Sequence, residues 1–143
     1  MDYLLYTDGA YFPEHERSAI AYVMLQSEPK KEVRRMNQTV KGETSARAEI
    51  KAIISAIYAL PQDAHSCNVI SDSKYAIDAL SRRCVCYSNI DLIALYDKIV
   101  KERGVGVTFS WVKSHNGNFY NELCDALCAQ AMDEYVSKKQ SLT

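Results

Sequence analysis

Four acidic residues, each in its own short local pattern, suggest metal-assisted chemistry on a phosphate ester. Asp8 and Asp72 each follow an apolar run, Glu49 lies in the first turns of an expected helix, and Asp125 opens the last one. Carboxylates at strand ends and helix starts tend to converge at one edge of an α/β sheet. Several carboxylates in one place repel each other unless a cation neutralises them. Because Mg²⁺ is bound by a few carboxylates together with water and substrate phosphate, the pattern predicts a divalent-metal site.

The oxygen-rich character of this set favours Mg²⁺ or Mn²⁺ over Zn²⁺, which prefers nitrogen and sulfur ligands. Two ions ~3.5–4 Å apart would activate a water molecule and stabilise the leaving oxygen of an in-line displacement. Asp8, expected at the end of a central strand, is predicted to bridge both ions. Glu49 and Asp72 are predicted to hold mainly the ion on the attacking-water side, and Asp125 the other.

The elements that position these residues follow from the apolar pattern of the chain. Strands are expected over residues 3–6, 19–25, 33–40, 68–71 and 105–112, and helices over 73–80, 91–103 and 118–136. A further helix is expected where apolar residues recur at helical spacing from Ile50 to Tyr58, with Thr44 or Ser45 as its N-cap and Pro61 ending the run. The order β-β-β-α-β-α-α-β-α predicts an α/β fold with a mixed five-stranded sheet and helices on both faces. Residues 1–136 are expected to form one catalytic domain, followed by a polar, flexible tail over residues 137–143.

Composition narrows the class of protein. The 143 residues carry a net charge of −1, which disfavours a protein that grips nucleic acid by bulk charge. No apolar stretch approaches the ~20 residues that a membrane helix needs, and the start of the chain does not resemble a signal peptide. The five cysteines are odd in number, which favours reduced thiols in a cytoplasmic compartment. A monomer is expected.

Five motifs in order make the chain similar to the type 1 ribonuclease H family. The resemblance covers roughly residues 3–132, and the motifs are Thr7-Asp8-Gly9, Arg47-Ala48-Glu49, Ser71-Asp72-Ser73-Lys74-Tyr75, Trp111-Val112-Lys113-Ser114-His115 and Asn121-Glu122-Leu123-Cys124-Asp125. It implies a ribonuclease H-like fold and endonucleolytic cleavage of the RNA strand of RNA–DNA hybrids, leaving 5′-phosphate and 3′-hydroxyl ends. Asp8, Glu49, Asp72 and Asp125 match the family's four metal-binding carboxylates.

The resemblance also implies roles for two further residues. His115 matches a histidine on a mobile loop that assists proton transfer or product release. Glu122 matches an acidic residue linked to the metal and water network. An imidazole on a flexible stretch can shuttle a proton near neutral pH, which is consistent with the role of His115.

Recognition of a hybrid requires contacts that sense the 2′-hydroxyl group on one strand. Backbone groups near residues 9–12 and 44–47 are the candidates, which include Gly9, Ser45 and Arg47. Phosphate contacts position a duplex without reading its sequence, so no strong sequence preference is expected. The residues predicted to reach phosphates are Ser73, Lys74, Lys113 and Asn121.

The chain departs from the family in two places. Its first loop, residues 10–18, contains no glycine, and Ser45, Ala46 and Lys74 replace residues that are common at substrate-contacting positions. The segment over residues 80–90 is short and lacks the family's lysine-rich protrusion that grips the DNA strand. Weaker substrate binding with a steep salt dependence is therefore expected.

Other interpretations stay open. The chain could be a catalytically weak nucleic-acid-binding module with the same fold, or a related polynucleotidyl transferase. Zinc binding by Cys84-x-Cys86 or by the pair Cys124 and Cys128 is an alternative, although neither spacing is that of common structural zinc sites. Cys124 and Cys128 share one helix face and are expected to pack as small apolar residues. Trp111 is expected to anchor the core.

Overall fold

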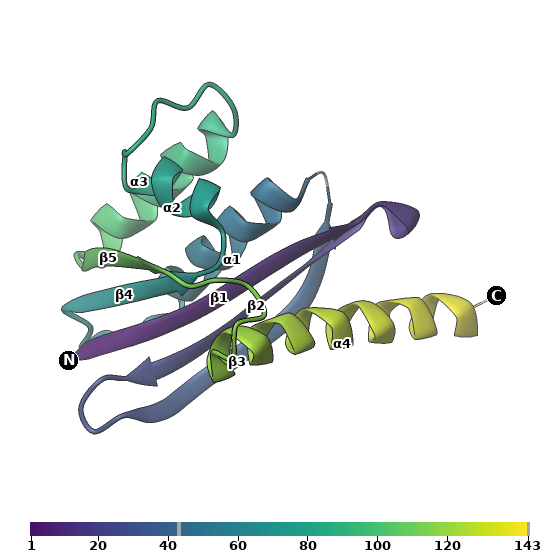
Figure 1. Ribbon diagram of the computed structural model, residues 1–143, viewed down its shortest axis with the longest axis horizontal. Helices are drawn as coiled ribbons and strands as arrows, with labels where there is room; N and C mark the ends of the chain where they lie inside the picture. The colour runs from purple at the N-terminus through teal and green to yellow at the C-terminus, as the bar shows by residue number, and fades with distance from the viewer. Residues whose placement is uncertain (43, 143) are drawn as a thin grey trace.

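The computed structural model describes residues 1–42 and 44–142, which form a three-layer α/β structure (Figure 1). Three helices cover one face of a five-stranded sheet and one long helix crosses the other. The strands are β1 (Asp2–Phe12), β2 (Arg17–Gln26), β3 (Lys31–Lys41), β4 (Ser66–Ser71) and β5 (Gly106–Trp111). The helices are α1 (Ser45–Tyr58), α2 (Lys74–Leu80), α3 (Ile90–Arg103) and α4 (Phe119–Ser141).

The sheet is mixed, in the order β3-β2-β1-β4-β5. The first three strands form an antiparallel meander, whereas β4 and β5 run parallel to β1. This arrangement confirms the predicted mixed five-stranded fold with helices on both faces. None of the helices described in the structure is long and apolar enough to cross a membrane.

Two apolar layers hold the sheet between its helices. On one face, Ile50, Ile53 and Ile57 of α1 pack with residues of β1 and β4 such as Leu5 and Val69. The four-residue and three-residue spacing of the isoleucines places them on one side of the helix. On the other face, α4 contributes its own set of buried residues, which are Cys124, Leu127, Cys128, Ala131 and Met132.

The first strand is longer than the sequence pattern predicts. Its parallel pairing with β4 ends at Tyr6 opposite Ile70, but its antiparallel pairing with β2 continues to Phe12 opposite Arg17. Asp8 is therefore inside a strand, just beyond the last parallel pair, and not at a strand end. The expected loop over residues 10–18 is reduced to a 3₁₀ turn, Pro13–His15, because β1 and β2 pair up to that turn.

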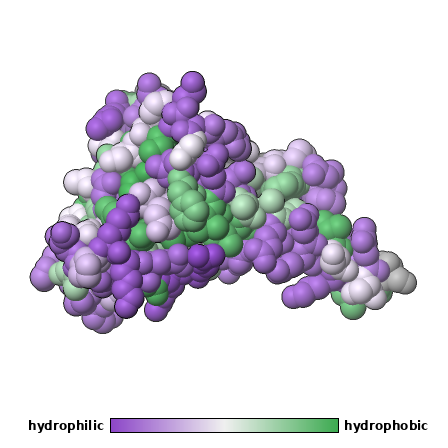
Figure 2. Space-filling model, turned by 60° about the horizontal axis from the view of Figure 1, so that its bottom comes forward, coloured by the Kyte–Doolittle hydropathy of each residue, from purple (hydrophilic) through white to green (hydrophobic). Residues whose placement is uncertain are grey.

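The last helix also extends past its predicted end. The predicted helix end at residue 136 is wrong, since α4 continues through Ser141. The segment contains neither glycine nor proline, and Lys138 and Lys139 lie in the last turn, where cations interact favourably with the helix dipole. Figure 2 shows this end of the molecule protruding as a largely hydrophilic arm, whereas hydrophobic residues gather nearer the middle of the same face.

Candidate active site

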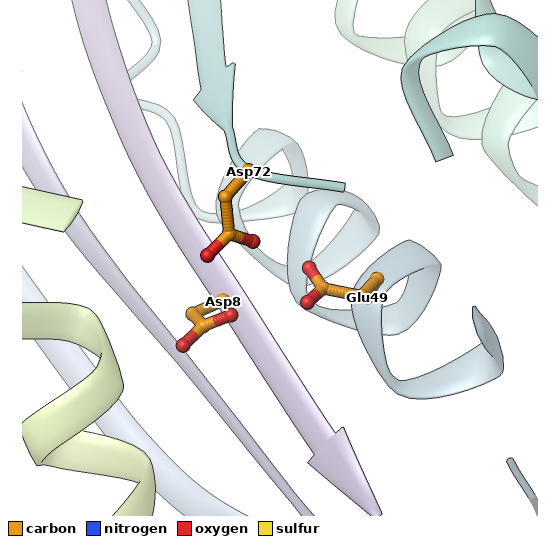
Figure 3. A group of neighbouring side chains, drawn as sticks. All are labelled: Asp8, Glu49 and Asp72. Atoms are coloured by element: carbon orange, nitrogen blue, oxygen red, sulfur yellow. The ribbon is translucent and has the colours of Figure 1, made fainter. Parts of the chain in front are cut away.

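Three carboxylates from distant parts of the chain meet at the centre of the sheet. One oxygen each of Asp8, Glu49 and Asp72 lies within 4.8 Å of the other two. Figure 3 shows the side chains pointing toward one another from β1, from α1 and from the segment that follows β4. Oxygen ligands gathered in this way are suited to a hard divalent cation.

Glu49 reaches the cluster because α1 begins almost in contact with β1. The side chain of Thr44 caps the helix by accepting a hydrogen bond from the backbone N–H of Arg47. Gly9 then permits the close approach, since a Cβ atom at that position would lie 2.4 Å from the carbonyl carbon of Ala48 and 2.6 Å from the backbone nitrogen of Glu49. Gly9, predicted as a substrate contact, thus has a packing role in the structure.

Asp72 is fixed from the other side by the last residue of β5 and the segment that follows this strand. The backbone N–H of Val112 donates to the carbonyl oxygen of Ser71 over 3.0 Å. The indole N–H of Trp111 donates to the carbonyl oxygen of Asp72 over 3.1 Å, and Ser114 Oγ donates to Asp72 Oδ2 over 2.9 Å. These contacts hold both the backbone and the carboxylate of Asp72 in place.

Burial and mutual repulsion make the cluster hold protons when no cation is bound. Burial, followed by the charge of Asp72, raises the pKa of Asp8 from 3.8 to about 7. Burial and the neighbouring charge of Asp8 raise the pKa of Glu49 well above its usual value. Glu49 Oε2 is buried and has no hydrogen-bond partner among the described residues. A divalent cation would satisfy that oxygen and replace the protons, so the residues fit a metal ion.

The fourth predicted carboxylate lies at the margin of the cluster. Asp125 is exposed on α4 and does not belong to the three-carboxylate group, but its charge contributes to the raised pKa of Asp8. The helix is docked beneath β1 by Cys128, whose thiol donates to the carbonyl oxygens of Asp8 and Ala19 at 3.6 and 3.7 Å. Glu122, one turn before Asp125, is also exposed.

His115 lies one residue after Ser114, on the loop between β5 and α4. Its side chain is exposed, and its backbone has a positive φ of 54°. Through the hydrogen bond between Ser114 and Asp72, this loop is tied directly to the carboxylate cluster.

The residues predicted to contact substrate fall into two groups. Ser45, Lys74 and Lys113 are exposed side chains. The others make contacts within the protein: Ser73 caps α2, and Asn121 is buried at the start of α4.

Arg47 belongs to this second group. Its guanidinium forms a two-pronged ion pair with Asp91, with nitrogen–oxygen distances of 2.9 and 2.7 Å. Asp91 lies in the first turn of α3, so the pair joins α1 to α3.

Two residues near Asp72 escaped sequence reasoning. The prediction that Trp111 lies in the core is wrong, since the exposed fraction of this residue is 54%, and its indole N–H donates to the carbonyl oxygen of Asp72. Ser114 belongs to one of the family motifs, but nothing in its local sequence indicates that it binds the Asp72 carboxylate. Cys124 and Cys128, by contrast, are buried as their spacing predicts.

Comparisons with known proteins agree with the geometry. The RNase H family model matches residues 1–133. A ribonuclease H from Clostridium botulinum is 30% identical, over 92% of this chain and 96% of that protein. One from Treponema denticola is 26% identical, over 95% of this chain and 100% of that protein. One from Anaeromyxobacter dehalogenans is 35% identical over 101 residues, where the match spans only 54% of the relative's length.

Solved structures share the fold at low sequence identity. The N-terminal RNase H domain of rv2228c from Mycobacterium tuberculosis superposes with a TM-score of 0.82 at 18% identity, covering 96% of this chain and 98% of that one. RNase H1 from Halobacterium salinarum gives a TM-score of 0.76 at 21% identity, covering 94% and 99%. With a family match over nearly its whole length and the same fold, the chain belongs to the RNase H family.

Proposed function

We propose that this chain is a divalent-metal-dependent endoribonuclease that cleaves the RNA strand of RNA–DNA hybrids. The products would carry 5′-phosphate and 3′-hydroxyl ends, and cleavage would have no strong sequence specificity. The observation that carries the proposal is the meeting of Asp8, Glu49 and Asp72 within 4.8 Å of one another. We further propose that the protein acts as a monomer in the cytoplasm, with residues 1–136 containing the catalytic machinery.

The carboxylates have separate tasks in this proposal. Asp8 would contact both of two bound Mg²⁺ or Mn²⁺ ions, Glu49 and Asp72 would hold one of them, and Asp125 the other. When bound, such ions activate a water molecule and stabilise the leaving oxygen. The raised pKa values of Asp8 and Glu49 mean that the protein itself disfavours their ionised forms until a cation is present.

In this proposal, proton transfer is carried out by a residue of the loop beside Asp72. His115 is exposed and anchored through Ser114, so it can approach a scissile phosphate that lies over the cluster. An imidazole can accept and donate a proton near neutral pH, which suits transfer to the leaving oxygen or help in product release. Glu122, exposed one turn before Asp125, would order water near the second ion.

Substrate contacts would come from groups around the cluster. The exposed side chains of Lys74 at the start of α2 and Lys113 after β5 would meet phosphates, together with the exposed Ser45 at the start of α1. Four further residues would contribute to this substrate-binding surface while also making contacts within the protein. They are Gly9, Arg47, Ser73 and Asn121. Contacts of this kind read backbone and shape, which is consistent with low sequence preference.

The decisive experiment is cleavage of an end-labelled RNA–DNA hybrid with Mg²⁺ and, separately, with Mn²⁺. Double-stranded RNA and double-stranded DNA of the same sequence serve as alternative substrates, and Asp8→Asn is the control variant. We expect cutting of the RNA strand in the hybrid alone, abolished by Asp8→Asn. A folded protein that binds the hybrid but cuts nothing with either ion would instead favour a nucleic-acid-binding module. Cutting of double-stranded DNA would favour a polynucleotidyl transferase.

A further inference from the structure

The loop between α2 and α3, residues 81–89, brings two cysteine thiols together at the surface. The Sγ atoms of Cys84 and Cys86 lie 3.0 Å apart. Cys84 is exposed and Cys86 is partly exposed, whereas the other three cysteines of the chain are buried. The dithiol lies outside the carboxylate cluster and has no part in the proposed hydrolysis.

Both ends of this loop are anchored, which leaves the dithiol between two fixed points. At the first end, Arg82 forms an ion pair with Asp97 and donates to the carbonyl oxygen of Ala79 over 3.1 Å. At the other end, the side-chain amide of Asn89 donates to the hydroxyl oxygen of Tyr75 over 3.0 Å.

The middle of the loop is open to small molecules. Val85 and Tyr87 beside the cysteines have exposed fractions of 79% and 86%. An open hollow of about 390 Å³ is lined by Ala79, Arg82, Cys84, Val85, Cys86 and Ile93. A reagent of small-peptide size can therefore reach the thiols without any opening of the core.

We propose that Cys84 and Cys86 form a thiol–disulfide exchange site for small-molecule disulfides of the glutathione type. The Cys84 thiolate attacks one sulfur of the small disulfide, so that a mixed disulfide forms and the first small thiolate leaves. The Cys86 thiolate then attacks Cys84 Sγ, which closes the Cys84–Cys86 bond and expels the second small thiolate. Two protein thiols are oxidised, one small disulfide is reduced to two thiols, and the two thiol protons pass to the departing thiolates.

Two features of the site support exchange that is reversible and dependent on pH. Only one residue separates the cysteines, so the bridge closes a small, strained ring, and strained or exposed disulfides are the readily reduced ones. The hydrogen bond with Cys86 raises the pKa of the Cys84 thiol, so the attacking thiolate becomes more abundant as the pH rises above neutrality.

The chain contains a second pair of cysteines with which the pair in the loop can be compared. Cys124 and Cys128 are close in sequence on α4, but both are buried, and their thiols donate to backbone carbonyl oxygens. Burial raises the pKa of both thiols. They are therefore expected to stay reduced in the folded protein under conditions that oxidise the loop.

The test is treatment of the full chain with oxidised glutathione at pH 8, followed by acid quenching, alkylation of the remaining thiols, and intact-mass and peptide analysis. The mass of the oxidised wild type is expected to be lower by two hydrogens. Peptide analysis should map the new disulfide to the peptide that contains Cys84 and Cys86. Cys84→Ser and Cys86→Ser are each expected to gain one persistent glutathione instead. Dithiothreitol should restore the original mass in all three proteins.

Three results would overturn the exchange site. These are a wild type that keeps its glutathione as stably as the single variants do, a wild type that remains unmodified, and a bridge that involves Cys67, Cys124 or Cys128. A circular-dichroism spectrum unchanged by the treatment ensures that the buried thiols were tested in the folded protein.

Discussion

Ser114 donates a hydrogen bond from its hydroxyl group to Oδ2 of Asp72 over 2.9 Å, which joins the histidine loop to the carboxylate cluster. The two residues are 42 positions apart in the chain. A carboxylate held by a neighbouring hydroxyl loses less freedom when a cation binds. Ser114 therefore prepares Asp72 for the metal and at the same time fixes the loop that carries His115.

Removing this contact should weaken metal use more than it weakens the fold. For Ser114→Ala we expect the Mg²⁺ concentration for half-maximal cleavage to rise by about tenfold, the usual effect of losing a group that orients a metal ligand. The measurement is hybrid cleavage over a range of Mg²⁺ concentrations. Ser110→Ala is the matched control, because Ser110 on β5 bonds to Asn68 and not to the cluster. Equal metal requirements in both variants would contradict a positioning role for Ser114.

Gly9 should be intolerant of a side chain. A methyl group there would lie 2.4 Å from the Ala48 carbonyl carbon, so Gly9→Ala must separate β1 from α1. We expect a loss of stability of at least ~1–3 kcal/mol and a large loss of cleavage, since Asp8 and Glu49 would move apart. Urea denaturation and the hybrid assay measure the two effects.

Gly106→Ala provides the control for Gly9→Ala. The nearest atom to a Cβ at Gly106 is the His65 carbonyl oxygen at 4.0 Å, so the added methyl group is accommodated. Its stability and activity should stay close to wild type. If the two variants behaved alike, the close approach of β1 and α1 would not be what requires glycine at position 9.

Without a divalent ion, the protein should become less stable as the pH rises from about 4 to about 7. The folded state keeps a proton on Asp8 up to its pKa of about 7, whereas the unfolded chain releases that proton near 3.8. The folded state thus binds more protons in this window, and stability falls as they are lost. The loss of stability that comes from Asp8 is on the order of a few kcal/mol, and the raised pKa of Glu49 adds to it.

Urea denaturation with EDTA at pH 5 and pH 8 checks this prediction. Mg²⁺ should reverse the trend, because it binds the deprotonated carboxylates of the folded state. Asp8→Asn should flatten the pH dependence and stabilise the metal-free protein at pH 8, since one repelling charge is gone. A wild type that is more stable at pH 8 than at pH 5 in EDTA would contradict the electrostatic account.

Asp8 and Asp125 should differ in their effects on metal binding. Asp8 belongs to the three-carboxylate group and Asp125 lies at its margin. We expect Asp8→Asn to abolish detectable Mn²⁺ binding in calorimetry, whereas Asp125→Asn keeps binding of one ion but loses most of its cleavage activity. Loss of all Mn²⁺ binding in Asp125→Asn would show that the fourth carboxylate is needed for the first ion as well.

The ion pair between Arg47 and Asp91 offers a test of whether Arg47 contacts substrate. If the arginine acts by joining α1 to α3, Arg47→Ala and Asp91→Ala should cause similar, modest losses of stability and leave the KM for the hybrid nearly unchanged. The measurements are urea denaturation and cleavage kinetics for both variants. A rise in KM confined to Arg47→Ala would assign that side chain to substrate binding.

Local patterns in the sequence were sufficient for the element types and for singling out the three carboxylates that meet in the structure, Asp8, Glu49 and Asp72. Isoleucines at helical spacing predicted α1. The apolar runs before Asp8 and Asp72 predicted β1 and β4, and the carboxylate cluster lies beside these two strands. The boundaries were less predictable. The end of β1 depends on its pairing with β2, and the end of α4 on the absence of any helix-breaking residue after Val136.

By itself, the sequence determined the mixed α/β fold and the order of the motifs that mark the RNase H family. Only the tertiary structure decided that Gly9 lets α1 approach β1, that Trp111 lies at the surface, and that Ser114 holds Asp72. The physical reason is the separation along the chain of the residues that are in contact. Hydrophobic periodicity reflects contacts between near neighbours, whereas these relationships join segments tens of residues apart, whose meeting depends on how the whole sheet and its helices pack.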